Sequence, residues 1–495
     1  MRLVFTSVLT LITAASLAQS PAATPAVSPE TRTAVRNLVG EVLVNGLAYD
    51  YDRHLANNIG PRLTGSDNYN HAVAWVLETF ISLGLANVHT ESFTMPALWE
   101  PETPATGHIS APLLHTLHIY SAGWSPSTPN AGITGNVLYL PDILPVEKLD
   151  TLKSQIVGQI VLIDDASLGK NPSIGDLVKA FDKLNSFAPT AVLLTGSANG
   201  TENAGALTFN GGLTNFPVAQ IGLEDELLIK SLLKNGAVAI QFAFKNRTRP
   251  ATQVNNVIAE IPGREPSQPG APDAIVIIGG HLDSWHPGTG AQDNGTGVAT
   301  VLDIARAVQA LGRPPRRTLR FILFGGEEQG LIGSTAYAMQ HRADMPSFDA
   351  VLISDLGAQP AKGWYLNARE DEKAALAPIE PLLANLGSDG TSSDNPYLFE
   401  SDHAGFDMLG VPTLFLWTPT DKYFTHHHQA SDTFDNVVQP DLAQGVATTA
   451  ATAYAIADAA QPFAPHNSPT QIEDMLRKSN ELENYKSLKT LGWVP

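Results

Sequence analysis

The chain has 495 residues, too many for one ordinary hydrophobic core, so its length predicts two or three domains. Hydrophobic residues make up 43% of it, as in soluble globular proteins. With 30 basic and 49 acidic residues, the net charge of −19 argues against non-specific binding to nucleic acid or to an anionic membrane. The chain has no cysteine, which excludes thiolate catalysis, cysteine zinc fingers and disulfides.

The amino terminus has the pattern of a secretory signal peptide. Arg2 precedes a short apolar run at residues 3–12, and Ser16-Leu17-Ala18 offers a small-x-small cleavage site. The run is shorter than the roughly 20 apolar residues of a membrane span. We therefore expect residues 1–18 to be a signal peptide and residues 19–28 a flexible leader. The mature protein would be exported, periplasmic or extracellular, with no membrane span.

The next residues, 29–105, predict helices and a strand that begin the main domain. Residues 31–51 have the apolar spacing of an amphipathic helix, and a turn-rich loop follows at 58–66. A second helix is predicted at 70–83 and a strand at 88–93.

Residues 106–250 have a different sequence pattern, which predicts short strands separated by Gly, Pro and Asn. One clear helix is predicted at 224–234. The segment contains no cluster of His and carboxylates, so we expect a small β-rich insert that serves as a lid or an interaction module.

Strands and helices alternate in residues 251–465, which predicts a mainly parallel sheet with helices on both faces. Together with residues 29–105 this segment would form a three-layer αβα domain of the α/β class. Residues 466–495 predict a helical tail without identifiable chemistry. The helices of the main domain are expected at 297–311, 331–342, 373–386 and 441–459.

Candidate metal ligands lie at or just after the ends of three predicted strands. His281 follows the first, Glu327 and Glu328 the second, and Asp355 the third. The carboxyl ends of strands in an open α/β sheet converge on one edge, where ligands bind. We therefore expect these residues to meet in one site although they are far apart in the sequence.

The sequence around each of these residues suggests which role it has in a metal site. His281 and Asp283 lie on one side of an extended segment, so His281 can bind a metal while the Asp283 carboxylate accepts the other imidazole N–H. Asp293 lies in a Gly-rich loop, where a carboxylate can bridge two ions. Glu327 and Glu328 repel each other unless a cation binds or one is protonated. Each motif alone has an ordinary structural explanation; their combination indicates a metal site.

Residues 426–428 are three consecutive histidines, and the residues alone do not single out one ligand among them. Ligands that mix His with carboxylates suit Zn²⁺, with Mn²⁺ or Co²⁺ as substitutes. Two ions about 3.5–4 Å apart would share a carboxylate and a hydroxide, lower the pKa of that water and stabilise the transition state.

Taken in order, the motifs resemble those of the co-catalytic di-zinc exopeptidases, a family that includes secreted aminopeptidases and glutamate carboxypeptidases, and look most like those of the plasma glutamate carboxypeptidases. The resemblance covers most of the chain, and the motifs are specific in combination. The insert resembles a protease-associated domain. The matching stretches are residues 60–66, 281–285, 291–295, 327–330, 354–355, 401–403 with 410–412, and 427–428 before 432–433.

The resemblance implies a role for each ligand. Asp293 would bridge two zinc ions, His281 and Asp355 would complete the shell of one, and Glu328 and His428 that of the other. His428 is chosen because the family's ligand lies four residues before the Asp-Thr pair that ends the motif. The peptide bond after Asp293 is often cis in such proteins.

The resemblance also implies catalytic and substrate-binding residues. Glu327 would be the general base, passing a proton from the bridging water to the leaving amine. His427 would help to hold the oxyanion, and Asp283 would support catalysis by orienting His281. Asp402, His403 and Tyr423 are candidate substrate-binding residues, and Asp402 and His403 have a structural alternative as supports of the metal loop.

The predicted function is hydrolysis of dipeptides or short peptides by an exported two-zinc metallo-exopeptidase, in which Glu327 activates a metal-bridged hydroxide. The sequence leaves open whether it is a carboxypeptidase, a dipeptidase or an aminopeptidase. The alternatives are an enzyme like glutaminyl cyclase, with one zinc, and a non-catalytic receptor-like relative. The resemblance also suggests a homodimer.

Overall fold

Short runs of aliphatic and aromatic residues form the strands of one large β-sheet. The computed structural model of the protein describes residues 27–169, 172–195, 211–265, 274–367 and 369–495. The strands in this part are β1 (Ala86–Ala111), β2 (His115–Thr116), β3 (Ile119–Ser121), β4 (Ile133–Tyr139), β5 (Ile160–Ile163), β6 (Ala191–Leu194), β7 (Val218–Ile221), β8 (Ala239–Ile261), β9 (Ile275–His281), β10 (Thr318–Phe324), β11 (Phe348–Ile353), β12 (Gly363–Tyr365), β13 (Gly390–Ser392) and β14 (Thr413–Trp417).

Helices and single helical turns connect these strands. The helices are α1 (Pro29–Asn45), α2 (Ala48–His54), α3 (Asp67–Ser82), α4 (Glu147–Ile156), α5 (Asp165–Leu168), α6 (Ile174–Phe187), α7 (Leu223–Leu233), α8 (Thr296–Leu311), α9 (Ile332–Gln340), α10 (Glu370–Leu376), α11 (Glu380–Leu383), α12 (Ala404–Asp407), α13 (Gln439–Ala457), α14 (Pro469–Lys478) and α15 (Leu482–Leu491). The turns are η1 (Leu55–Ile59), η2 (Ala291–Gly295), η3 (Met345–Ser347), η4 (Ala384–Leu386), η5 (Tyr423–Thr425) and η6 (Phe434–Asn436).

The main part of the sheet has the strand order β13-β12-β14-β11-β9-β10-β8, with β1 paired to β8. The central strands β10, β9, β11 and β14 are parallel to one another, and β8 runs antiparallel to β10. Parallel strands bring their carboxyl ends to one edge, so the residues after β9, β10 and β11 come together there. The fold is a mixed α/β fold with a central sheet, as the sequence predicted.

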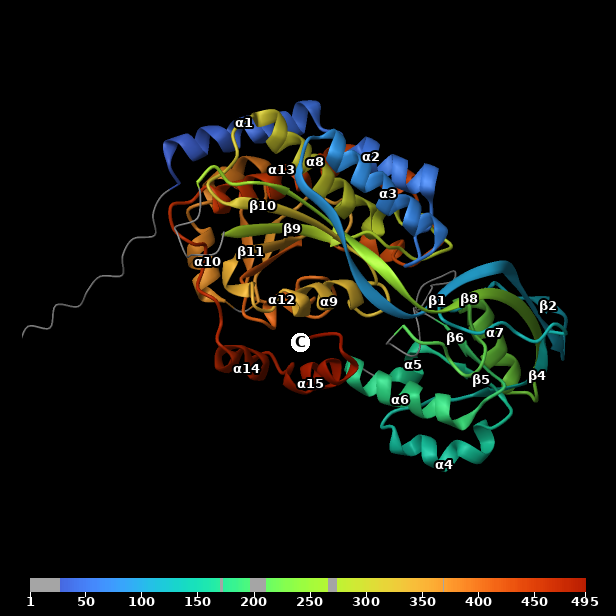
Figure 1. The fold of residues 1–495 in the computed structure, drawn as a ribbon. Coiled ribbons are helices and arrows are strands. Elements are labelled where there is room, and N and C mark those ends of the chain that lie inside the picture. The colour runs from blue at the N-terminus through green and yellow to red at the C-terminus, as the bar shows by residue number, and fades with distance from the viewer. Residues whose placement is uncertain (1–26, 170–171, 196–210, 266–273, 368) are drawn as a thin grey trace, which may run out of the picture.

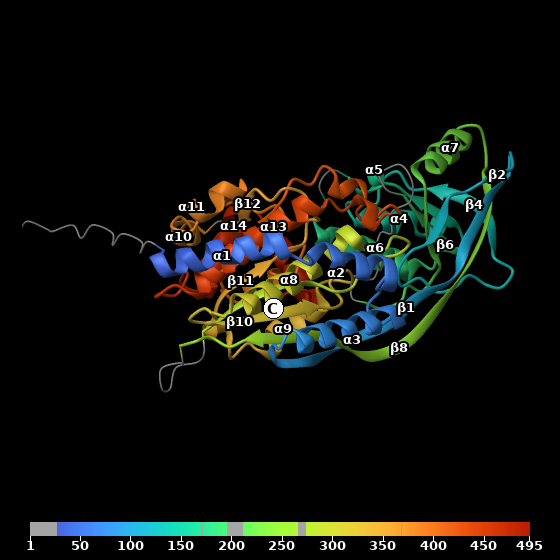
Figure 2. The ribbon, with the colours of Figure 1, turned by 90° about the horizontal axis from the view of Figure 1, so that it is seen from above.

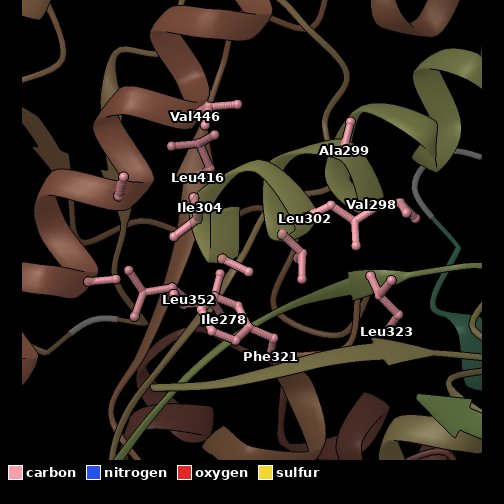
Figure 3. Close-up of a cluster of buried hydrophobic side chains, with 14 of the residues drawn as sticks. Ile278, Val298, Ala299, Leu302, Ile304, Phe321, Leu323, Leu352, Leu416 and Val446 are labelled. Carbon is pink, nitrogen blue, oxygen red and sulfur yellow. The ribbon is translucent and has the colours of Figure 1, made fainter. Parts of the chain in front are cut away.

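Helices cover both faces of this sheet (Figure 1). Residues along β9 alternate between two cores: Val276 and Ile278 pack with α1, α8 and α13, whereas Ile275 and Ile277 pack with α9 and α12. This two-residue period is what a strand buried on both faces requires. Figure 3 shows the first of these cores, in which side chains of α8 meet those of β9, β10 and β11.

The segment predicted as an insert continues the same sheet. Strands β4, β5, β6 and β7 are parallel to one another, and β4 joins the sheet through β8. Two further hydrophobic cores lie on this part of the sheet. Its described residues form four helices, α4 to α7, where one was predicted, so this segment is mixed α/β and not simply β-rich. The apolar spacing Leu149, Leu152 and Ile156 in α4 is helical and was overlooked among the surrounding Gly, Pro and Asn residues.

The predicted boundaries of the insert, at residues 105/106 and 250/251, fall inside strands. β1 and β8 pair with each other from Ala86↔Glu260 to Ala111↔Ala239, through both boundaries. The two long strands can be followed from the main part of the sheet into the insert in Figures 1 and 2.

Several predicted helices are broken in the structure. The helix predicted at residues 31–51 ends at Asn45, because Gly46 leaves the helical conformation, and α2 begins at Ala48. The helix predicted at residues 373–386 is split into α10, α11 and η4, because Pro378 and Pro381 lack the amide hydrogens of a continuous helix. The tail forms two helices, α14 and α15, that pack on the main domain.

Within the described residues, no helix is long and apolar enough to cross a membrane. The predicted signal peptide, and the leader up to residue 26, lie outside the described residues.

Candidate metal centre

The first group of predicted ligands lies at the carboxyl ends of β9 and β11. His281, the last residue of β9, places its Nε2 3.0 Å from Asp355 Oδ1 and 3.2 Å from Asp293 Oδ1. All three side chains are buried. The hydroxyl of Ser401 donates to the other oxygen of Asp355, Oδ2, at 2.6 Å, and so fixes the carboxylate.

The second group lies on the other side of Asp293. His428 Nε2 is 3.0 Å from Glu328 Oε2 and 3.3 Å from Asp293 Oδ2. Asp293 therefore points one carboxylate oxygen at His281 and the other at His428. The structure thus brings all five predicted ligands together, in the two sets that the family resemblance implies. The peptide bond from Asp293 to Asn294 is cis, as the resemblance also implies.

The chemistry of the two groups fits zinc. Imidazole nitrogens and carboxylate oxygens are ligands that Zn²⁺ prefers. Glu328 Oε1 is buried and has no hydrogen-bond partner in the described part of the chain, so it is free to ligate. Burial and the neighbouring Asp293 raise the pKa of the Glu328 carboxyl to about 7. Keeping the Glu328 carboxylate ionised without a cation is therefore costly, and a bound metal ion would remove that cost.

Glu327 lies beside this cluster and lines the adjoining cavity. Its Oε2 is 4.0 Å from His281 Nε2. Because adjacent residues point in different directions, Glu328 reaches the His428 group while Glu327 faces the space next to His281. The assignment of Glu328 as a ligand and of Glu327 as the base remains a proposal.

Asp283 does not hold His281 in the way that we predicted. The Nδ1 of His281 donates to the backbone carbonyl of Asp283 at 3.0 Å, whereas the Asp283 carboxylate is 3.7 Å away. The carboxylate instead accepts from the Thr64 hydroxyl at 2.7 Å and from the amides of Glu327 and Glu328, both at 3.4 Å. Because Nδ1 carries the proton in this hydrogen bond, Nε2 is the nitrogen that can bind a metal. The Asp283 carboxylate thus positions the turn of the two glutamates, and the backbone carbonyl of Asp283 orients the imidazole.

Asp432 has a positioning role that the sequence did not assign, although the residue belongs to the matched motif. Its carboxylate accepts from the amides of Gln292 and Asp293 at 2.7 and 3.2 Å. These bonds fix the backbone that presents Asp293 to both ligand groups.

Arg62 also holds the ligand loops and was missed, although its loop resembled the family's. Its side chain is fully buried and donates to the carbonyls of Leu282, Thr289 and Gly290 at 2.9, 2.9 and 2.8 Å. Burial lowers the pKa of the Arg62 guanidinium, and the nearby buried Asp52 carboxylate partly offsets this shift. Arg62 therefore ties the N-terminal loop to the segments that carry His281 and Asp293.

Arg62→Ala is expected to lower the free energy of unfolding by about 3–5 kcal/mol, because it leaves buried carbonyls and a buried carboxylate without their cation. Urea unfolding measures the change. The control, Arg53→Ala, removes only an exposed pair with Asp50 and should change stability by less than about 1 kcal/mol. Equal stability of the two variants would contradict a structural role for Arg62.

The other predicted site residues separate into two groups. His427 and Tyr423 line the cavity. The His427 ring stacks on His428 with centroids 3.7 Å apart, and its Nε2 is 3.5 Å from Asp293 Oδ2. His427 is thus also within reach of the metal groups, whereas His426 turns away to Ser431.

Asp402 and His403 are fully buried and do not line the cavity. His403 stacks on Phe415, with ring centroids 4.7 Å apart, and Asn395 lies 3.3 Å from its Nε2. Burial lowers the pKa of His403 to about 3, so the ring is neutral. These positions favour the structural alternative, support of the metal loop, over contact with substrate.

A cavity of about 230 Å³ opens beside the ligands. Pockets for drug-sized ligands have volumes of about 300–1,000 Å³, so this cavity suits a small substrate. Besides the metal-site residues, its lining consists of Gly330, Leu331, Leu356, Tyr397, Phe399, Glu400, Phe415, Tyr423, Phe424 and Trp493.

Comparisons with known proteins agree with this geometry. Residues 256–454 match the model of peptidase family M28. Carboxypeptidase Q of Mus musculus is 28% identical over 413 residues, which are 82% of this chain and 84% of the mouse protein. The crystal structure of a peptidase M28 precursor from Shewanella amazonensis has a TM-score of 0.73 and 27% identity, covering 89% of this chain and 99% of that one. A zinc aminopeptidase from Bacillus subtilis shares the fold, with a TM-score of 0.62, 20% identity and coverage of 85% and 97%.

The fold, the ligand geometry and these relatives define the chain as a zinc metallo-exopeptidase. Its residues 256–454 are similar to peptidase family M28, and carboxypeptidase Q is among the relatives of the whole chain. The resemblance found in the sequence is confirmed.

Proposed function

We propose that this chain is an exported exopeptidase that uses two zinc ions to hydrolyse dipeptides or short peptides. The observation that carries the proposal is the position of Asp293 between the two ligand groups. Its Oδ1 faces His281, which lies with Asp355 in the first group, and its Oδ2 faces His428, which lies with Glu328 in the second. The two ions, when bound, would lower the pKa of a water and polarise the scissile carbonyl.

The protein's own residues perform the proton transfer and hold the substrate. Glu327 takes a proton from the attacking water and delivers it to the leaving amine. The Asp283 carboxylate holds the turn from which Glu327 projects. His427 supplies an N–H to the developing oxyanion. Burial and the adjacent His428 lower the pKa of its ring to about 3, so the ring is neutral and carries one N–H.

The charge of the cavity favours substrates with a free amino terminus. Among the described residues that line it, five are carboxylates, namely Asp293, Glu327, Glu328, Asp355 and Glu400, and none is Lys or Arg. With Asp293, Glu328 and Asp355 bound to metal ions and Glu327 acting as the base, Glu400 is the lining carboxylate that is left to attract a substrate ammonium group, whereas a terminal carboxylate finds no cationic side chain in the lining. We therefore propose an aminopeptidase or dipeptidase specificity within the exopeptidase class.

N-acetylation of a dipeptide or tripeptide substrate is expected to abolish cleavage, because it removes the ammonium charge. The measurement compares unblocked, N-acetylated and C-amidated forms of one peptide series with zinc-loaded protein. Loss on acetylation alone indicates an aminopeptidase, and loss with either block a dipeptidase. Loss on amidation alone would indicate a carboxypeptidase and contradict the proposed specificity.

The alternative functions are not favoured. A receptor-like relative needs no working metal residues, but both ligand sets and Glu327 are present here. The similarity to M28 peptidases likewise does not favour an enzyme like glutaminyl cyclase, with one zinc.

The remaining parts of the proposal rest on the sequence and the family. Export to the periplasm or the extracellular space rests on the signal-peptide pattern, and the homodimer on the resemblance. We propose residues 106–250 as a module like a protease-associated domain, supported by its own hydrophobic cores.

A further inference from the structure

The C-terminal tail reaches the cavity that adjoins the metal centre. Helices α14 and α15 lie along α9 and α12, and α15 also contacts α6 of the insert (Figure 1). After α15 the chain turns back, and Trp493 becomes one of the residues that line the cavity. The sequence assigned no chemistry to this segment.

Close packing holds Trp493 in this position. The amide of Trp493 donates to the carbonyl of Leu488 at 3.0 Å, and the Thr335 hydroxyl of α9 donates to the Trp493 carbonyl. The next residue, Val494, is 2% exposed and packs with Leu331 and Phe399. The end of the chain is therefore anchored on both sides of Trp493.

The indole lies directly on the turn that follows the two glutamates. A Cβ at Gly330 would be only 2.3 Å from Trp493 Cε2, so a glycine is needed for this approach. The amides of Gly330 and Leu331 both donate to the carbonyl of Glu327, at 2.8 and 2.9 Å. Trp493 is thus one turn away from the proposed general base.

Other aromatic residues complete an apolar wall around the same space. Tyr397, Phe399, Phe415 and Phe424 line the cavity together with Trp493. The indole of Trp493 has few rotatable bonds, and beside these rings it offers a large, flat apolar surface to a substrate side chain that enters the cavity. The metal groups and Glu400 supply the polar part of the lining.

We propose that Trp493 is a specificity-determining residue, and that the C-terminal segment forms the wall of the pocket that receives the substrate side chain next to the scissile bond. The substrate class is short peptides whose terminal residue is aromatic or a large aliphatic. This inference rests on the proposed peptidase function. The tail is therefore part of the substrate site as well as a structural brace.

The test compares Trp493→Ala and Trp493→Phe with wild-type protein on the dipeptides Phe-Gly, Leu-Gly and Ala-Gly. For Trp493→Ala, kcat/KM for Phe-Gly and Leu-Gly should fall by about 10- to 100-fold, and for Ala-Gly by less than about 3-fold. Trp493→Phe should retain most of the preference for large side chains, and zinc content should stay at the wild-type value. Lys486→Ala, an exposed change on the same tail, should leave all three rates unchanged.

A merely structural role would lower the three rates by the same factor, and an unchanged ratio of Phe-Gly to Ala-Gly would overturn the proposal. If wild-type protein cleaves no peptide, the proposed function fails, but the wall can still be tested. Free phenylalanine should then change the tryptophan fluorescence of wild-type protein and not that of Trp493→Phe. Equal changes in both proteins would overturn the wall itself.

Discussion

Glu327→Gln is expected to lower kcat by about 10²- to 10⁴-fold, the usual contribution of a general base. The amide has the shape of the carboxylate but cannot accept the proton of the attacking water. Because Glu327 is not among the proposed ligands, zinc content should equal that of wild type, and KM should change little. Steady-state kinetics on an unblocked dipeptide, together with metal analysis of the same sample, measure both quantities.

The same chemical change at an exposed position serves as the control. Glu224 lies on the surface of α7 in the insert, and Glu224→Gln should leave kcat unchanged. An unchanged kcat in Glu327→Gln would contradict the proposed proton transfer by Glu327. A fall in kcat together with loss of zinc would instead make Glu327 a ligand and overturn its assignment as the base.

Asp293→Asn is expected to reduce zinc from two ions per chain to one at most, and to lower kcat by more than about 10³-fold. The carboxylate of Asp293 faces both ligand groups, and a neutral amide cannot offer an anionic oxygen to each of them. Elemental analysis after dialysis against zinc gives the stoichiometry. This measurement also separates the two-zinc proposal from a one-zinc enzyme, since the latter predicts one ion in the wild-type protein.

Asp389→Asn is the matched control, because Asp389 is exposed and belongs neither to the ligand groups nor to the lining of the cavity. It should bind as much zinc as wild type. Two ions retained by Asp293→Asn would contradict a bridging role. One ion in the wild-type protein would contradict the two-zinc proposal as a whole.

The sequence predicted the sheet, and the structure brings the candidate ligands together, because both features follow from local patterns. The strand that precedes His281 is a continuous apolar run, and such runs are typical of strands buried on both faces. Since the ligands follow these runs directly, strand geometry alone brings His281, Glu328 and Asp355 to one edge.

Other contacts could not be predicted because they depend on how distant segments pack. Arg62 binds backbone carbonyls, which have no signature in the sequence. The Asp283 carboxylate accepts hydrogen bonds from Thr64 and from two amides, and not from the imidazole of His281 two residues away in the sequence. Only the three-dimensional positions of these groups decide between the partners. Trp493 enters the cavity through the docking of the whole tail. The break at Pro378 and Pro381, in contrast, was readable from the sequence.

The two long strands β1 and β8 have a consequence for how the molecule moves and unfolds. β8 pairs with β10 at Val257–Ile261 and with β4 at Ala239–Phe242, and β1 accompanies it over nearly its whole length. The insert is therefore joined to the catalytic core by a paired β-ribbon and not by a flexible hinge. A paired ribbon resists bending. Unfolding of either part breaks strand pairs of β1 and β8 that also belong to the other part. The two parts should thus melt as one cooperative unit.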